Sequence, residues 1–126
     1  MKRDMDLCRK ILLATEEMPP NGEVRSEGLA MPLGIDANVI DYHITLLVEA
    51  GLVDGIDVST LENSYSFIIT RLTWEGHEFL DSARDDGHWS QAKGVAEKAG
   101  AWGFSAISNI LASIATEAWK QQLGTN

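Results

Sequence analysis

The sequence has 126 residues, 44% hydrophobic and 23% charged, which are the proportions of a globular protein that buries one core. Ten Lys and Arg against nineteen Asp and Glu give a net charge of −9, which opposes nonspecific binding to nucleic acid or to an anionic membrane. Cys8 is the single cysteine, which excludes an intrachain disulfide, and Met1-Lys2-Arg3 leads into acidic residues and not into a signal segment. These features predict a protein of a reducing cytosol.

The first predicted helix covers residues 4–18, with Asp4 as its N-cap and an apolar stripe that includes Cys8 as a packed, inert thiol. Pro19-Pro20-Asn21-Gly22 ends this helix, because proline lacks an N–H and Asn-Gly favours a turn. Residues 23–26 are expected to form a short strand. Residues 28–34 contain too much Gly and Pro to predict a helix of normal length.

A central helix is predicted at residues 37–50, with Asp36 as its N-cap and Gly51 ending it in a left-handed conformation. Ile40, Ile44 and Leu47 recur at helical spacing, so we expect them to be buried. His43 is interpreted as a half-buried residue that hydrogen-bonds locally and not as a catalytic base. Two strands are predicted next, at residues 52–58 and 66–72, with the turn at residues 62–64.

Three further helices are predicted: one capped by Thr73, one at residues 88–99 that ends at Gly100, and one at residues 104–123. The last helix has a polar face too dense for a membrane span, and its small residues suggest a homodimer through this helix. Trp74 and Trp89 are assigned to the core. Trp102 and Trp119 flank the last helix, where they either cover the edge of the core or anchor a partner.

This order of elements predicts a mostly α fold with a small β wing. The wing is the pair of strands at residues 52–72. We expect a winged helix-turn-helix domain at residues 1–86, with a C-terminal helical extension at residues 87–126 packed on it as a single globular unit.

Several sequence segments resemble known families. Residues 42–53, YHITLLVEAGLV, resemble the recognition helix and wing start of small bacterial winged-helix repressors of the arsenic-sensor type. Residues 1–7 (MKRDMDL), 42–52 and 71–89 (RLTWEGHEFLDSARDDGHW) together resemble a family of small phage and prophage proteins known as domain of unknown function 2513. The resemblance covers roughly residues 1–98. It implies a winged-helix fold and a phage setting, and it supplies no catalytic residues.

A winged helix suggests DNA binding, but the charges oppose it. No Lys or Arg occurs between Arg25 and Arg71, whereas seven Asp or Glu do, and DNA affinity comes largely from neutralising phosphates. Lys2, Arg3, Arg9 and Lys10 cluster on the first helix instead. The predicted macromolecule-binding residues, which lie on the central helix and wing, are Asn38, Asp41, Tyr42, Thr45, Glu49, Asp54 and Asp57.

Two hypotheses follow for a non-enzymatic macromolecule-binding module. The first is a DNA-binding transcriptional regulator. The second is an acidic inhibitor that binds a basic surface of a host or phage protein, such as a defence protein, as a DNA mimic.

The sequence gives little support for metal binding or catalysis. His77, Asp81 and Asp85 are each one helical turn apart, with His88 close by, so a metal site is chemically conceivable, but the chain contains no established metal-ligand motif. No nucleophile stands beside a base, and no glycine-rich phosphate loop follows a strand. The sequence therefore predicts no catalytic residue, cofactor or metal.

Overall fold

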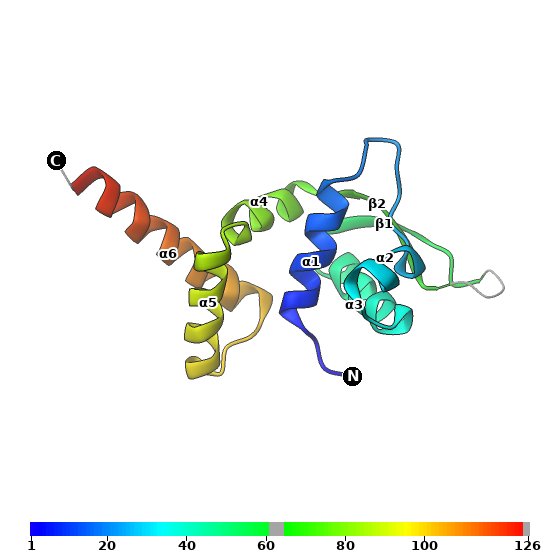
Figure 1. The fold of residues 1–126 in the computed structure, drawn as a ribbon, viewed down its shortest axis with the longest axis horizontal. Helices are drawn as coiled ribbons and strands as arrows, with labels where there is room; N and C mark the ends of the chain where they lie inside the picture. The colour runs from blue at the N-terminus through cyan, green and yellow to red at the C-terminus, as the bar shows by residue number, and fades with distance from the viewer. Residues whose placement is uncertain (61–64, 125–126) are drawn as a thin grey trace. The chain divides into compact units, whose positions relative to one another are not determined.

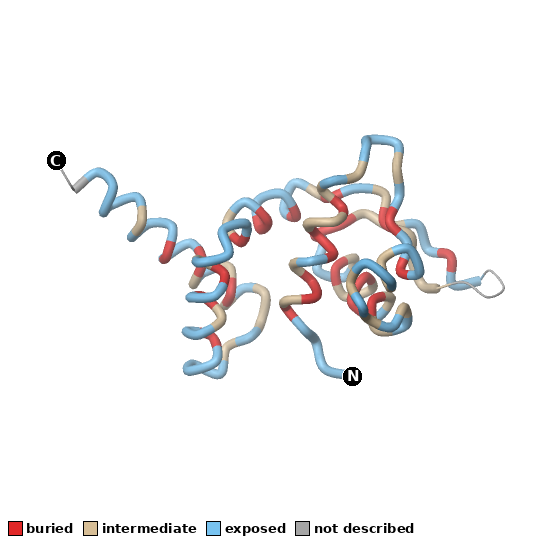
Figure 2. Tube along the Cα trace, viewed as in Figure 1, coloured by how far each residue is buried: buried red, intermediate tan, exposed pale blue. Residues whose placement is uncertain are grey.

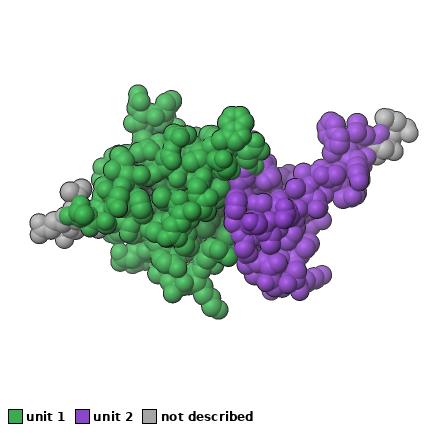
Figure 3. Space-filling view, turned by 180° about the vertical axis from the view of Figure 1, so that it is seen from behind, with its two compact units in different colours: residues 1–78 green, residues 79–126 purple. Residues whose placement is uncertain are grey.

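The computed structural model describes residues 1–60 and 65–124. The predicted turn at residues 62–64 lies outside them. The chain divides into two compact units, Met1–Glu78 (unit 1) and Phe79–Asn126 (unit 2), which Figure 3 shows in separate colours. The described residues are mostly helical, with one two-stranded antiparallel hairpin between helices, which confirms the predicted fold class. The domain boundary predicted after residue 86 stays a prediction.

Unit 1 contains α1 (Met5–Glu16), α2 (Ser26–Leu33), α3 (Ala37–Glu49), β1 (Val53–Asp57), β2 (Phe67–Leu72) and the start of α4 (Trp74–Ala83) (Figure 1). Helix α3 packs against α1 and α2, and the hairpin contacts both α1 and α3. The core of unit 1 is built from the apolar faces of these elements, which Figure 2 shows as buried segments. It includes Leu7, Ile11, Leu12, Ile40, Ile44, Leu47 and Ile69.

Helix α2 corrects the prediction for residues 28–34, where no helix of normal length was expected. The structure forms an eight-residue helix here despite Gly28 and Pro32. Packing against α3 stabilises it, and Gly34 ends it at φ 66°, with its N–H donating to carbonyls of the last turn. Tertiary contact therefore outweighs the low helix propensity of this stretch. Residues 23–26 do not form the expected strand, because Val24 makes a single bridge to Ile69 and Ser26 already begins α2.

The central helix follows its prediction closely. The Asp36 side chain accepts a hydrogen bond of 2.8 Å from the Asn38 N–H, and Gly51 adopts φ 74° just after the helix. Leu47 is buried, as expected. The hairpin pairs Val53 with Leu72 and Asp57 with Phe67, with an irregularity between Asp54 and Gly55.

Helix α4 begins against the turn between α3 and β1. The Thr73 hydroxyl accepts a hydrogen bond of 3.0 Å from the Gly76 N–H, which confirms the predicted cap. The Thr73 N–H donates to the Leu52 carbonyl at 3.0 Å, and the Thr73 hydroxyl donates to the Gly51 carbonyl. Gly76 lies against the Leu52 carbonyl so closely that a Cβ at this position would overlap it. Glycine is therefore required for this approach of helix to backbone.

Unit 2 contains the end of α4, then α5 (Asp86–Ala99) and α6 (Phe104–Gly124). Its core joins Trp89, Ala92 and Ala96 of α5 to Ile107, Leu111 and Ile114 of α6, and the Phe79 ring contacts the rings of Trp89 and Phe104. Helix α5 starts two residues before its predicted start, because Asp85 caps it by accepting from the His88 N–H at 2.8 Å. Gly100 ends α5 as predicted, at φ 66°.

The burial of the tryptophans agrees only in part with the prediction. Trp89 is buried, as expected. The assignment of Trp74 to the core is wrong, since 76% of its surface is exposed. Trp119 is also largely exposed, at 64%. Among the described residues, no helix combines the length and the apolar character that crossing a membrane requires.

Candidate macromolecule-binding face

One side of α3 carries four of the predicted binding residues. Asn38, Tyr42, Thr45 and Glu49 are spaced by four, three and four residues, so they share a face of the helix opposite the buried Ile40 and Ile44. Asn38, Tyr42 and Glu49 are exposed, and Thr45 is half-buried. The Thr45 hydroxyl donates to the Asp41 carbonyl at 3.1 Å. We call these four residues, together with Asp41, Asp54 and Asp57, the helix–hairpin face.

Asp41 is held by the hairpin and is only partly exposed. Its carboxylate accepts a hydrogen bond of 2.9 Å from the Ser66 N–H and one of 3.1 Å from the Ser66 hydroxyl. These bonds attach α3 to the start of β2. Both donors are uncharged, so they position the Asp41 carboxylate without compensating a negative charge. Its spacing on the helix predicts exposure, and this long-range structural role was missed.

Asp54 and Asp57 occupy β1 and differ in their partners. The Asp54 carboxylate forms an ion pair of 2.5 Å with the Arg71 guanidinium, which compensates its charge. The Asp57 carboxylate accepts from the N–H and hydroxyl of Ser59, at 2.9 and 2.7 Å. These hydrogen bonds hold the pKa of Asp57 below its usual value, so this exposed carboxylate stays ionised.

The structure brings Asp41 and Asp57 to the same end of the hairpin. Ser66 donates to Asp41, its carbonyl accepts from the Val58 N–H, and the next residue, Phe67, pairs with Asp57. Asp54 lies further along β1, beside Arg71. Two carboxylates with uncharged partners therefore lie near each other, in a chain that has no Lys or Arg between Arg25 and Arg71.

The negative charge of the chain is concentrated in unit 1. Residues 1–78 contain six Lys and Arg and fourteen Asp and Glu, a net charge of −8, whereas residues 79–126 contain four and five, a net charge of −1. Four of the six Lys and Arg in unit 1 lie near its start, and the prediction that all four lie on the first helix is only half right: Arg9 and Lys10 are on α1, whereas Lys2 and Arg3 precede it. The helix–hairpin face therefore belongs to the unit that carries most of the negative charge of the chain.

His43 is fully buried, at 1% exposure, and not half-buried as the sequence suggests. The predicted local hydrogen bond is present, because Nδ1 donates to the Val39 carbonyl at 2.8 Å. Nε2 accepts from the Asp4 N–H at 2.8 Å, a long-range partner that the sequence does not indicate. Each ring nitrogen therefore has a backbone partner, so the role of the His43 imidazole is to join α1 to α3.

The residues of the metal hypothesis have other partners. Asp81 accepts a hydrogen bond of 3.0 Å from Arg84, and Asp85 caps α5. His77 lines a small hollow of about 130 Å³ in unit 1, together with Thr15, Met18, Thr70 and Arg71. Within residues 1–60 and 65–124, no three His, Cys, Asp or Glu side chains form a group that would hold a metal ion.

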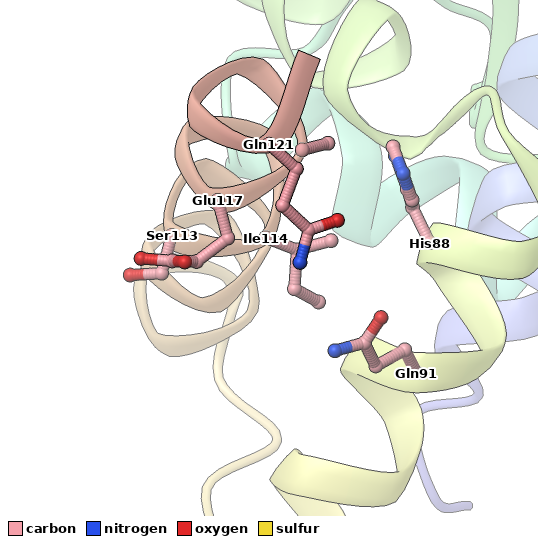
Figure 4. A pocket seen from close by; sticks show the side chains of 7 residues that line it. His88, Gln91, Ser113, Ile114, Glu117 and Gln121 are labelled. Carbon is pink, nitrogen blue, oxygen red and sulfur yellow. The ribbon is translucent and has the colours of Figure 1, made fainter. Parts of the chain in front are cut away.

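A larger hollow of about 370 Å³ lies between α5 and α6 of unit 2. Figure 4 shows His88, Gln91 and Gln121 around this space, with Ile114 between them. The lining side chains are mostly polar.

Cys8 is buried on α1, and burial raises the pKa of its thiol to about 11. A thiol with this pKa is a poor nucleophile near neutral pH.

Comparison with known proteins identifies the family of this chain. Residues 2–102 match the model of a family described as "Hypothetical protein (DUF2513)". The chain belongs to the DUF2513 family. A relative of 43% identity over 94 residues is an uncharacterized protein of Haemophilus influenzae, and the match covers 74% of this chain and 76% of the relative. The DUF2513 match covers unit 1 from its second residue and extends through α5.

Proposed function

We propose that this DUF2513 protein is a non-enzymatic winged-helix module whose helix–hairpin face binds a basic surface of a host or phage protein. In this proposal α2 and α3 are the helix-turn-helix pair, and β1 and β2 are the wing. The order of α1, α2, α3 and hairpin supports this interpretation, as does the packing of α2 on α3. The resemblance of residues 1–7, 42–52 and 71–89 supports a phage or prophage setting in the bacterial cytoplasm.

One observation carries the choice of partner. Asp41 and Asp57 are fixed by uncharged donors, so their charges are oriented without being neutralised. Glu49, on α3, adds an exposed carboxylate to these two. A DNA backbone would meet these charges with repulsion, whereas the Lys and Arg of a protein surface would be attracted. Because DNA-binding proteins display such basic surfaces, an inhibitor that occupies one of them is a specific form of this proposal.

The test is a charge-neutralised variant with a matched control. Asp41→Asn, Glu49→Gln and Asp57→Asn are combined, since an amide oxygen still accepts from the N–H groups of Ser66 and Ser59, and the new amide NH2 at position 41 can donate to the Ser66 hydroxyl. The control combines Asp81→Asn, Glu97→Gln and Glu117→Gln in unit 2, which changes the net charge by the same amount. Asp54 is left unchanged because Arg71 already compensates it.

Both variants and the natural chain are used to capture partners from host lysate and then tested with the purified partner. We expect affinity to fall at least about tenfold in the helix–hairpin variant, to be retained in the control, and to weaken as salt rises. Equal losses in both variants would mean that net charge acts without a defined surface. Submicromolar, sequence-selective binding to promoter DNA, undiminished in the helix–hairpin variant, would establish the regulator hypothesis instead.

A further inference from the structure

We propose that Trp74, Glu75 and Glu78 of α4 form a binding site for an arginine side chain of the partner protein. The inference rests on the proposed function in taking the partner to be basic. It adds a second point of attachment outside the helix–hairpin face. Trp74 is the starting observation, because 76% of its surface is exposed beside two carboxylates of the same helix, and tryptophan is among the residues enriched at protein interfaces.

A hydrogen bond orients the indole of Trp74. Its Nε1–H donates a hydrogen bond of 2.9 Å to Oε1 of Glu78, one helical turn later. The polar edge of the ring is thus occupied by a carboxylate, and the ring surface stays exposed. A ring fixed before binding loses less side-chain entropy when a ligand stacks on it.

The helix that carries the indole is itself firmly placed within unit 1. Gly76 lies against the Leu52 carbonyl, and Thr73 hydrogen-bonds to both Gly51 and Leu52. Trp74 and Glu78 each stand two residues from Gly76, so they lie on the opposite, outward side of α4. The contact with Leu52 therefore directs the indole away from the core.

The charges around the indole specify a cation. Glu75 and Glu78 are exposed, and α4 contains three Asp or Glu and no Lys or Arg. Arg71, the preceding cation in the sequence, is ion-paired with Asp54. A guanidinium stacked on tryptophan gains a cation–π contact, and its N–H groups can also donate to the two carboxylates. Arginine suits this site better than lysine because its planar group stacks and donates at once.

The experiment follows the indole N–H resonance of Trp74 in the ¹⁵N-labelled full chain, assigned with Trp74→Phe. The probe is a tetra-arginine peptide, compared with a tetra-citrulline peptide, which is nearly isosteric but uncharged, and with tetra-lysine. We expect a saturable shift of the Trp74 resonance with tetra-arginine, a weaker response to tetra-lysine and none to citrulline. An equal shift with citrulline would overturn the proposal, since charge would then play no part.

Variants separate this site from general attraction to an acidic protein. Trp74→Leu should weaken tetra-arginine binding, followed at the Glu75 and Glu78 amides, about two- to fivefold. Glu78→Gln, which keeps the acceptor for the indole, should also weaken it. Trp119→Leu is the matched control, since Trp119 is exposed on α6, whose charges balance. Unchanged affinity in Trp74→Leu, or an equal loss in Trp119→Leu, would refute the site.

The outcome is distinguishable from that of the proposed function. In the Asp41, Glu49 and Asp57 variant the shift of the Trp74 resonance should persist, because those residues lie outside this site. Loss of the Trp74 response in that variant would show that the peptide binds the helix–hairpin face and that α4 has no arginine site. Circular dichroism and thermal melting of each variant confirm that the fold is retained.

Discussion

The main-chain N–H of Asp4 donates a 2.8 Å hydrogen bond to Nε2 of His43, which joins the N-cap of α1 to the buried side of α3 across 39 positions of the sequence. Nδ1 of the same ring donates to the Val39 carbonyl, so the hydrogen is on Nδ1 and the lone pair on Nε2. One imidazole therefore satisfies a backbone donor of the chain's first segment and an acceptor within α3. Few side chains other than histidine offer a donor and an acceptor in this rigid arrangement.

Replacing this imidazole should destabilise the fold. His43→Leu keeps an apolar side chain in the buried site but leaves the Asp4 N–H without its acceptor. We expect a loss of about 1–3 kcal/mol in the free energy of unfolding, measured by urea denaturation. Asn38→Ala, at an exposed position of the same helix, is the control and should stay within about 0.5 kcal/mol. Equal stability of His43→Leu and the natural chain would mean that the Asp4 bond contributes nothing.

Gly76 should tolerate no side chain. In Gly76→Ala the new methyl group meets the Leu52 carbonyl, so the first turn of α4 must move away. We expect the free energy of unfolding to fall by about 1–3 kcal/mol, as it does when a packed site receives an extra methyl group. Gly94→Ala is the control, because Gly94 lies within α5 with open space around its Cβ position. That change should stabilise the protein by about 0.4–1 kcal/mol. Matching melting temperatures for the two variants would contradict this packing.

Cys8 should make stability sensitive to alkaline pH. Burial raises the pKa of its thiol from 9.0 to about 11, so the folded state holds the proton more tightly than the unfolded state. This contribution is fully present below about pH 9 and is lost as the pH rises through about 11. Urea denaturation between pH 7 and pH 11 should therefore show a steeper decline for the natural chain than for Cys8→Ala. Parallel pH profiles would show that this thiol does not differ between the two states.

We also predict a weak homodimer through α6. Ala112 and Ala115 are exposed small residues on this helix, and Trp119 and Leu123 are exposed large ones further along. Two antiparallel copies of α6 can therefore set large side chains over small ones in a two-fold arrangement. Sedimentation at roughly 10–100 μM, the range of a weak dimer, should show association. Trp119→Ala combined with Leu123→Ala should abolish it, and Trp74→Ala should not. A monomer throughout this range would leave α6 without a self-association role.

Most helices and strands were predicted correctly because the residues that begin and end them act on nearby backbone groups. Asp36 before α3, Thr73 before α4 and Gly100 after α5 act on the nearest backbone groups, so their roles are evident in the sequence. Leu47 follows the helical period of its neighbours and is buried as predicted. Helix α2 was missed because its own residues disfavour a helix and its stability comes from α3, whose position a linear pattern does not contain.

Prediction of the candidate site was limited in the same way, because long-range partners are not evident in the sequence. Tyr42 and Glu49, both predicted as binding residues, are exposed on α3. Helical spacing could not show that Asp41 is held by Ser66, because that partner is 25 residues away. Trp74 was assigned to the core from its residue type. The decisive neighbour is Gly76, whose contact with Leu52 determines which side of α4 faces the protein.

The charge difference between the units also has a kinetic consequence. A net charge of −8 on residues 1–78 creates a field that acts on a cationic molecule before contact, over a distance of about 10 Å at 0.1 M salt. Residues 79–126, at −1, contribute little to it. A basic protein diffusing nearby would thus be drawn preferentially toward unit 1. Its association rate should depend steeply on ionic strength, while the lifetime of the finished complex depends on the close contacts.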